Sequence, residues 1–137
     1  MTPLLEISDL HLGFDGVNGV TPALRGVSLT LQRGECVALV GQSGSGKSVT
    51  GMTILRLLGP NARLSQGAIR FDGTDLLAQS ERQMREIRGK RIAMVFQNAK
   101  AALNPIRRVG DTLADILLAH DREGLTRKQA MDRIVEI

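Results

Sequence analysis

The 137-residue sequence has no tryptophan or tyrosine and only three phenylalanines. Nucleic-acid surfaces often stack bases on aromatic side chains, so this scarcity argues against nucleic acid as a partner. The single cysteine, Cys36, excludes an internal disulfide and fits a reducing compartment. No apolar run reaches the roughly 18 residues of a membrane-spanning helix, and no basic segment opens a secretory signal. We therefore expect a cytoplasmic protein that reaches a membrane only through a partner.

The rest of the composition is that of an ordinary globular chain, with 42% hydrophobic residues and a formal net charge of +4. This modest positive excess suits a phosphate ligand, but bland soluble domains carry it equally often. The length corresponds to about one domain. Composition therefore leaves the function to be argued from motifs.

The first 34 residues predict antiparallel β structure. Residues 27–31 alternate apolar and polar side chains, which is typical of a strand with one face in solvent. The continuous apolar run at residues 36–40 predicts a strand buried on both faces of a parallel sheet, and residues 92–96 predict a second one. Cys36 would then be a small core residue. The sequence thus changes from an antiparallel region to an α/β core.

Two helices are predicted in the middle of the chain. Residues 47–58 have apolar side chains at near-helical spacing and stop at Gly59. Residues 80–89 open with a capping box of Ser80 and Gln83.

Two more helices are predicted near the end of the sequence. The first has an apolar face made of Val109, Leu113, Ile116 and Leu117. The second begins at Thr126, which forms a predicted capping box with Gln129. Its predicted inward-facing residues are Ala130, Met131, Ile134 and Val135. No helix stop follows Ile137, and a doubly wound sheet normally needs more than two buried strands. We therefore expect the chain to be a truncated domain.

The segment "GQSGSGKS" fits the G-x-x-x-x-G-K-[ST] phosphate-binding loop, and it stands between a predicted strand and a predicted helix, as that motif requires. Its glycines permit a tight turn with backbone N–H groups facing phosphate, and the helix N-terminus adds its positive end. Lys47 would reach the β- and γ-phosphates and Ser48 would ligate magnesium. The candidate loop residues are Gly41, Gln42, Ser43, Gly44, Ser45, Gly46, Lys47 and Ser48.

Five segments in this order resemble the ATP-binding subunit of an ABC transporter: "LEISDLHLGF", "LRGVSLTLQRGE", "GQSGSGKSVT", "RIAMVFQ" and "LNP". "FQNAKAALNPIRRVGDTL" is similar to the peptide and nickel importer subfamily, from which it departs at Asn98 and Ala99. The resemblance implies the N-terminal part of a P-loop ABC ATPase domain. It would comprise an antiparallel β region at residues 1–34, a P-loop α/β core with a RecA-like parallel sheet at residues 35–105, and the start of a helical subdomain at residues 106–137.

The resemblance also implies roles for residues outside the loop. Gln97 would be the Q-loop glutamine, which ligates magnesium, approaches the attacking water and couples to the membrane subunit. Phe14 stands where the family has the aromatic that stacks on adenine; the alternative is a core phenylalanine on a strand. Lys47 and Gln97 are thus the candidate catalytic residues, and Ser48 and Gln97 the candidate magnesium ligands, with ATP and Mg²⁺ as cofactors.

A complete ATPase of this family has further motifs that do not follow Gln97. These are an LSGGQ-type signature, a Walker B aspartate with a catalytic glutamate, a D-loop and a switch histidine. We therefore expect the full-length parent to hydrolyse ATP and this chain alone to be inactive. The implied partners are integral-membrane transporter subunits, a second ATP-binding subunit in a homodimer or heterodimer and, indirectly, a solute-binding protein. The location would be the inner face of a bacterial plasma membrane.

Three alternatives stay open on the residues alone. A GTPase switch is suggested by "DREG" at residues 121–124, which matches D-x-x-G but follows an amphipathic helix and lacks a later Asn-Lys-x-Asp. A turn between helices is the competing interpretation. A phosphate-loop kinase would need an acceptor site that the sequence does not show. A non-catalytic module that docks on a membrane protein is the third alternative.

Overall fold

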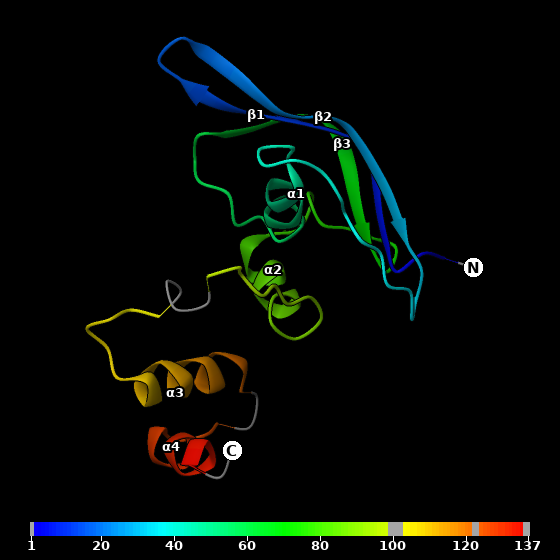
Figure 1. Ribbon diagram of the computed structural model, residues 1–137. Helices are drawn as coiled ribbons and strands as arrows, with labels where there is room; N and C mark the ends of the chain where they lie inside the picture. The colour runs from blue at the N-terminus through cyan, green and yellow to red at the C-terminus, as the bar shows by residue number, and fades with distance from the viewer. Residues whose placement is uncertain (1, 99–102, 122–123, 136–137) are drawn as a thin grey trace. The chain divides into compact units, whose positions relative to one another are not determined.

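The computed structural model describes residues 2–98, 103–121 and 124–135 (Figure 1). The chain divides into two compact units, Met1–Arg85 and Glu86–Ile137.

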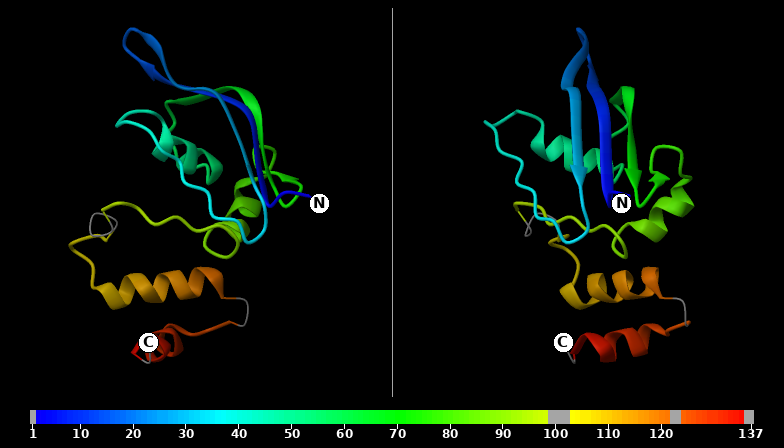
Figure 2. Two further views of the ribbon diagram at one scale, coloured as in Figure 1. Left: turned by 45° about the vertical axis from the view of Figure 1, so that its right-hand side comes forward. Right: turned by 90° about the vertical axis from the view of Figure 1, so that its right-hand side faces the viewer.

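The first unit is built on an antiparallel sheet in the order β2-β1-β3-β4, whose strands lie side by side in Figure 2. The strands are β1 (Leu5–Gly16), β2 (Gly19–Leu31), β3 (Ala62–Phe71) and β4 (Thr74–Asp75). Residues 27–31 alternate half-buried and exposed positions, which confirms the antiparallel pattern expected there. β3 adds a third long strand to this sheet from a later part of the sequence.

Helix α1 (Lys47–Ile54) lies against one face of the sheet (Figure 2). The core between them contains buried leucines from two neighbouring strands, Leu12 and Leu24, which are opposite each other in the β1–β2 ladder, and Leu55 just after α1. Burying each such side chain stabilises the fold by about 1.5–3 kcal/mol. This core therefore holds α1, whose first turn carries the phosphate-binding motif, against the sheet.

α1 ends four residues earlier than the expected limit at residue 58, because Arg56 takes the left-handed conformation with φ +52°. Leu57 N donates to Met52 O at 2.9 Å and Arg56 N to Thr53 O at 3.0 Å, which is a Schellman C-cap. Such a cap usually has glycine. Here the Arg56 guanidinium donates to Gln79 O at 2.5 Å, a contact that offsets the backbone cost.

The two expected parallel strands are wrong for this structure. Residues 36–40 and 92–96 form no strand, and Val40 and Val95 are 92% and 90% exposed. A parallel strand needs neighbours that pair with its N–H and C=O groups. The described residues supply neither segment with a strand partner; only a single bridge joins Arg88 to Ile92. Cys36 is accordingly exposed and not a core residue.

The predicted capping boxes are confirmed. In α2 (Glu81–Ile87), Ser80 N donates to Gln83 Oε1 at 2.8 Å and Gln83 N donates to Ser80 Oγ at 3.3 Å. Ahead of α4 (Arg127–Val135), Thr126 and Gln129 make the same pair of bonds at 2.9 and 3.3 Å.

The second unit contains α3 (Val109–His120) packed on α4. The apolar face predicted for α3 is largely wrong, because Val109, Leu113 and Ile116 are exposed, and the buried residue of this helix is Ala114. On α4, Ala130 is buried as predicted, whereas Val135 is 84% exposed. Small residues thus bring the two helices together.

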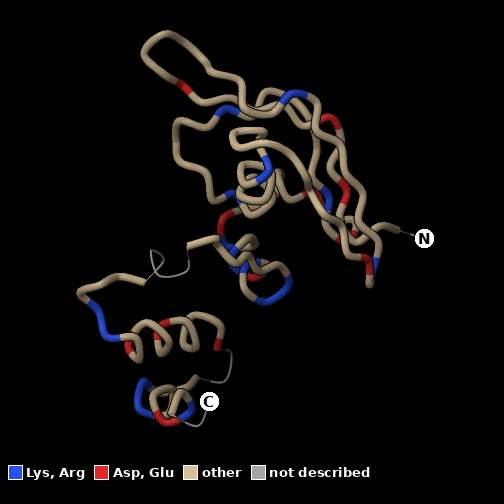
Figure 3. The backbone as a smooth tube through the Cα atoms, viewed as in Figure 1, with Lys and Arg blue, Asp and Glu red and all other residues tan. Residues whose placement is uncertain are grey.

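Charged side chains join these helices across their surfaces. Arg127 of α4 donates to Asp111 at 2.8 Å and to Asp115 at 3.0 Å, and Arg107 donates to Asp115 at 2.5 Å. Figure 3 shows acidic positions along α3 and basic ones on α4. The hydrogen bond and the charge of Arg107, followed by those of Arg127, lower the pKa of Asp115, while desolvation acts in the opposite direction. The bonds to Asp111 and Asp115 raise the pKa of Arg127.

Candidate functional site

The loop at residues 41–48 is held together by the lysine of the motif. Lys47 Nζ donates to Gly41 O at 2.6 Å, to Gln42 O at 2.7 Å and to Ser45 Oγ at 3.1 Å. A second link is the turn bond from Ser45 N to Gln42 O at 3.3 Å. The cationic end of Lys47 therefore lies within the curve of the loop.

Two glycines give the loop its path. Gly44 and Gly46 have φ values of +79° and +92°, in the left-handed region that favours glycine. A Cβ on Gly44 would meet nothing within 4 Å, so this side of the loop is open to a ligand. The structure thus fits a cradle that presents backbone N–H groups to an anion.

The start of α1 has the polarity that an anion requires. Its N-cap is Gly46, which makes no side-chain capping bond, and its first turn has no acidic residue. The N–H groups of this turn are therefore available to a ligand, and the helix dipole places positive charge there. Ser48, the second helical residue, is exposed and places its hydroxyl at this end.

Thr50 stabilises the same turn through hydrogen bonds to the carbonyl of Gly46. It is 3% exposed, its N–H donates to Gly46 O at 2.8 Å, and its hydroxyl donates to the same oxygen at 3.0 Å. Sequence reasoning missed this residue. The available signal was a threonine four positions after a glycine, because threonine commonly bonds back to the carbonyl four residues earlier.

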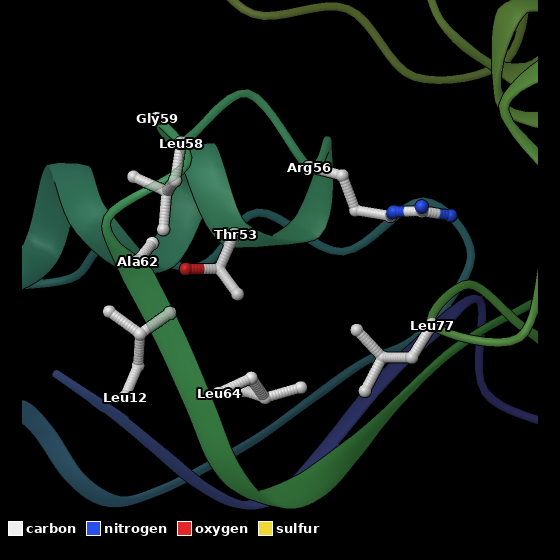
Figure 4. Close-up of a pocket in the computed structure, with 8 residues that line it drawn as sticks. All are labelled: Leu12, Thr53, Arg56, Leu58, Gly59, Ala62, Leu64 and Leu77. Atoms are coloured by element: carbon white, nitrogen blue, oxygen red, sulfur yellow. The ribbon is translucent and has the colours of Figure 1, made fainter. Parts of the chain in front are cut away.

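Phe14 lies on the side of the sheet that faces α1. In the β1–β3 ladder Phe14 is opposite Ala62, and Leu12, two residues earlier, is opposite Leu64. With no register shift between these pairs, Phe14 shares the face of Leu12. That face and α1 enclose a pocket of about 340 Å³, which Leu12, Thr53, Ala62 and Leu64 help to line (Figure 4). Phe14 is half-buried, so both interpretations of its role stay open.

Gln97 belongs to the second unit, where it is exposed at a bend. Its role with magnesium therefore stays a prediction. Of the two departures from the subfamily pattern, Asn98 is described, whereas Ala99 lies outside the described residues.

The D-x-x-G segment includes residues 122 and 123, which lie outside the described residues. Asp121 follows helix α3 and its Oδ2 accepts a hydrogen bond from Leu125 N at 2.6 Å. This local bond is the turn chemistry that the competing interpretation predicts.

Among residues 2–98, 103–121 and 124–135, no group of three or more His, Cys, Asp or Glu side chains could hold a metal ion. In the same part of the chain, no helix is both long and apolar enough to cross a membrane.

The family described as ABC transporter matches residues 24–136. The probable D,D-dipeptide transport ATP-binding protein DdpD of Escherichia coli (strain K12) is 45% identical over 136 residues, which cover 98% of this chain and 41% of that protein. The oligopeptide transport ATP-binding protein OppD of Bacillus subtilis (strain 168) is 41% identical over 138 residues, covering 100% of this chain and 38% of that protein.

Solved structures show the same fold. The dimeric structure of MJ0796, a bacterial ABC transporter cassette, aligns with a TM-score of 0.78 at 23% identity and covers 96% of this chain and 54% of that chain. The same cassette bound to ADP and Pi aligns with a TM-score of 0.75 at 21% identity.

A glycine-rich loop that leads into a helix beside this sheet defines a phosphate-loop protein. The comparisons identify which kind, and the chain belongs to the ABC transporter family. The predicted resemblance to the ATP-binding proteins of peptide importers is confirmed, as is the fold class, part of an ABC ATPase domain. The chain spans about 40% of the length of the curated relatives it matches.

Proposed function

We propose that the chain is the nucleotide-holding part of an ATP-binding subunit that couples ATP hydrolysis to the uptake of peptides by a bacterial importer. The observation that carries the proposal is the loop at residues 41–48, closed by Lys47 ahead of a helix whose first turn has no side-chain cap. The names of the relatives, which are transport ATP-binding proteins for dipeptides and oligopeptides, favour peptides as the solute.

The residues of the loop fit a nucleoside triphosphate. Lys47 supplies a cation, Gly44 leaves space for the phosphates, and the first turn of α1 supplies unpaired N–H groups. Ser48 and Gln97 are the proposed magnesium ligands. Phe14, on the face of the sheet toward α1, is proposed to stack on adenine. Bound ATP and magnesium would supply the phosphoryl chemistry; the chain's own contribution is to bind and orient the phosphates.

The partners follow from the same proposal. A membrane transporter subunit and a second ATP-binding subunit would complete the transporter, and a solute-binding protein would act indirectly. The ATP-binding subunit would lie at the cytoplasmic face of the membrane. The sequence contains no Walker B acid or signature motif after Gln97. The 137-residue chain by itself should therefore bind magnesium-ATP without turning it over.

Titration of the chain with magnesium-ATP and magnesium-GTP analogues tests the proposal. Lys47→Ala should weaken the binding of both by about 10- to 100-fold, because it removes charge-assisted hydrogen bonds to phosphate. Lys90→Ala is the matched control, since Lys90 loses the same charge but pairs with Glu86 at 3.2 Å. Equal affinities of the two variants for nucleotide would contradict the proposal. Magnesium-ATP turnover by the wild-type chain above the Lys47→Ala background would contradict the expectation that the chain alone is inactive.

A further inference from the structure

β2 makes a close contact with the phosphate loop at Gly46. A Cβ built on Gly46 would lie 2.7 Å from Leu24 Cδ2 and 3.1 Å from Ala23 O, and no other atoms outside its immediate chain neighbours lie within 4 Å. Real Cβ atoms essentially never approach a heavy atom within 3.0 Å. The glycine just before Lys47 is therefore packed directly on β2.

A bulge in β2 places both of these atoms. The β1–β2 pairing passes from Leu12 opposite Leu24 to Gly13 opposite Pro22, so Ala23 is an extra residue on β2. Bulges disrupt the ladder locally and re-aim the neighbouring groups. Here the carbonyl of Ala23 and the side chain of Leu24 both point toward the last glycine of the loop.

Leu24 also belongs to the core that positions Phe14. It is 3% exposed and lies opposite Leu12, which shares the α1 side of the sheet with Phe14. The leucine therefore touches the proposed phosphate site and the strand pair that carries the proposed base site. Because protein interiors are close-packed, a displacement at one of these contacts is passed on to the neighbouring side chains.

We infer that Leu24 is a positioning residue that fixes the phosphate loop at a set distance from the base-binding strands. This inference rests on the proposed function. A ligand that contacts both sites at once gains from their fixed separation, because binding at one site presents the ligand to the other. A ligand that contacts the loop alone gains nothing from it. Leu24 thus contributes to ATP binding without touching ATP.

The test compares magnesium-ATP with magnesium-bound inorganic triphosphate, measured by calorimetric titration of the 137-residue chain. Leu24→Ala should lower the affinity for ATP relative to that for triphosphate by about tenfold. Leu76→Ala is the matched control: Leu76 is a fully buried leucine that follows β4, and it has no atom near the Gly46 position. Leu24→Met, which keeps the volume, should restore the wild-type ratio.

Amide hydrogen exchange gives a readout that needs no nucleotide. Leu24→Ala should speed exchange at residues 46–48 in the free chain, whereas Leu76→Ala should not. If Leu24→Ala does not fold, Leu24→Val and Leu76→Val replace the pair, since valine lacks the Cδ2 atom that lies near Gly46. An unchanged ATP-to-triphosphate ratio in Leu24→Ala, or in Leu24→Val where the alanine variant does not fold, would overturn the inference and leave the proposed function standing. Failure of the wild-type chain to bind either ligand would overturn both.

Discussion

Gly44 and Gly46 have similar backbone angles but different surroundings. Both have positive φ, yet a Cβ on Gly44 would enter open space whereas one on Gly46 would meet Leu24 and Ala23. Glycine is thus required at position 44 by conformation alone, and at position 46 by conformation and space together.

Alanine at these two positions should separate the effects. Gly44→Ala should reduce the free energy of unfolding by about 1 kcal/mol, the cost of a left-handed alanine. Gly46→Ala should reduce it by about 3 kcal/mol, because overpacking against β2 adds to the same cost. Urea unfolding of both variants checks this. Similar losses of unfolding free energy in the two variants would mean that β2 shifts to accommodate a Cβ at position 46 without a measurable cost.

The sequence predicted the position of the loop well, because the signal for it is local. The loop motif needs only eight consecutive residues, and the structure shows Lys47 closing that loop. It could not predict Leu24, because the contact with Gly46 joins residues 22 positions apart through a bulge. Nor could it predict that Arg56 would end α1. The side chain of Arg56 donates a hydrogen bond to the carbonyl of Gln79, a residue far along the sequence.

At the scale of elements, α3 and α4 are joined by a cluster of ion pairs around Asp115. Its carboxylate accepts bonds from Arg107 and Arg127, and the first of these is the main cause of its lowered pKa. A carboxyl whose pKa is lower in the folded state stabilises the fold above its unfolded pKa, and this contribution is lost as pH falls through the folded pKa.

Asp115→Asn should therefore lower the thermal midpoint of helix unfolding near neutral pH, and the difference from wild type should shrink below about pH 4. The effect should be small because the pairs are solvent-exposed. Circular dichroism at both pH values measures it. Asp132→Asn is the control, since Asp132 is exposed and has no ion pair among the described residues. A difference that does not change with pH would contradict this account of Asp115.

The starts of two helices could be predicted from local sequence, whereas the pairing of strands could not. Ser80 and Thr126 mark helix starts because a capping box is complete within four residues. The apolar runs at residues 36–40 and 92–96 read as buried strands, but a strand forms only where another strand pairs with it. The described residues supply none, so residues 36–40 are exposed and residues 92–96 are exposed or half-buried.

At the scale of the whole chain, the ABC fold is recognisable although the chain covers 54% of the length of the aligned cassette. The part that folds around α1 contains both the loop and Phe14. We attribute this to the antiparallel sheet, which pairs its long strands within residues 5–71 and so needs no later segment.

Amide hydrogen exchange with and without magnesium-ATP tests whether residues 41–48 hold the phosphates of ATP. We expect slower exchange at Gly44, Gly46, Lys47 and Ser48 when nucleotide is present, because these N–H groups would then donate to the phosphates. We expect no protection at residues 37–40, which are exposed in the structure. Protection that appears only outside residues 41–48 would contradict the account.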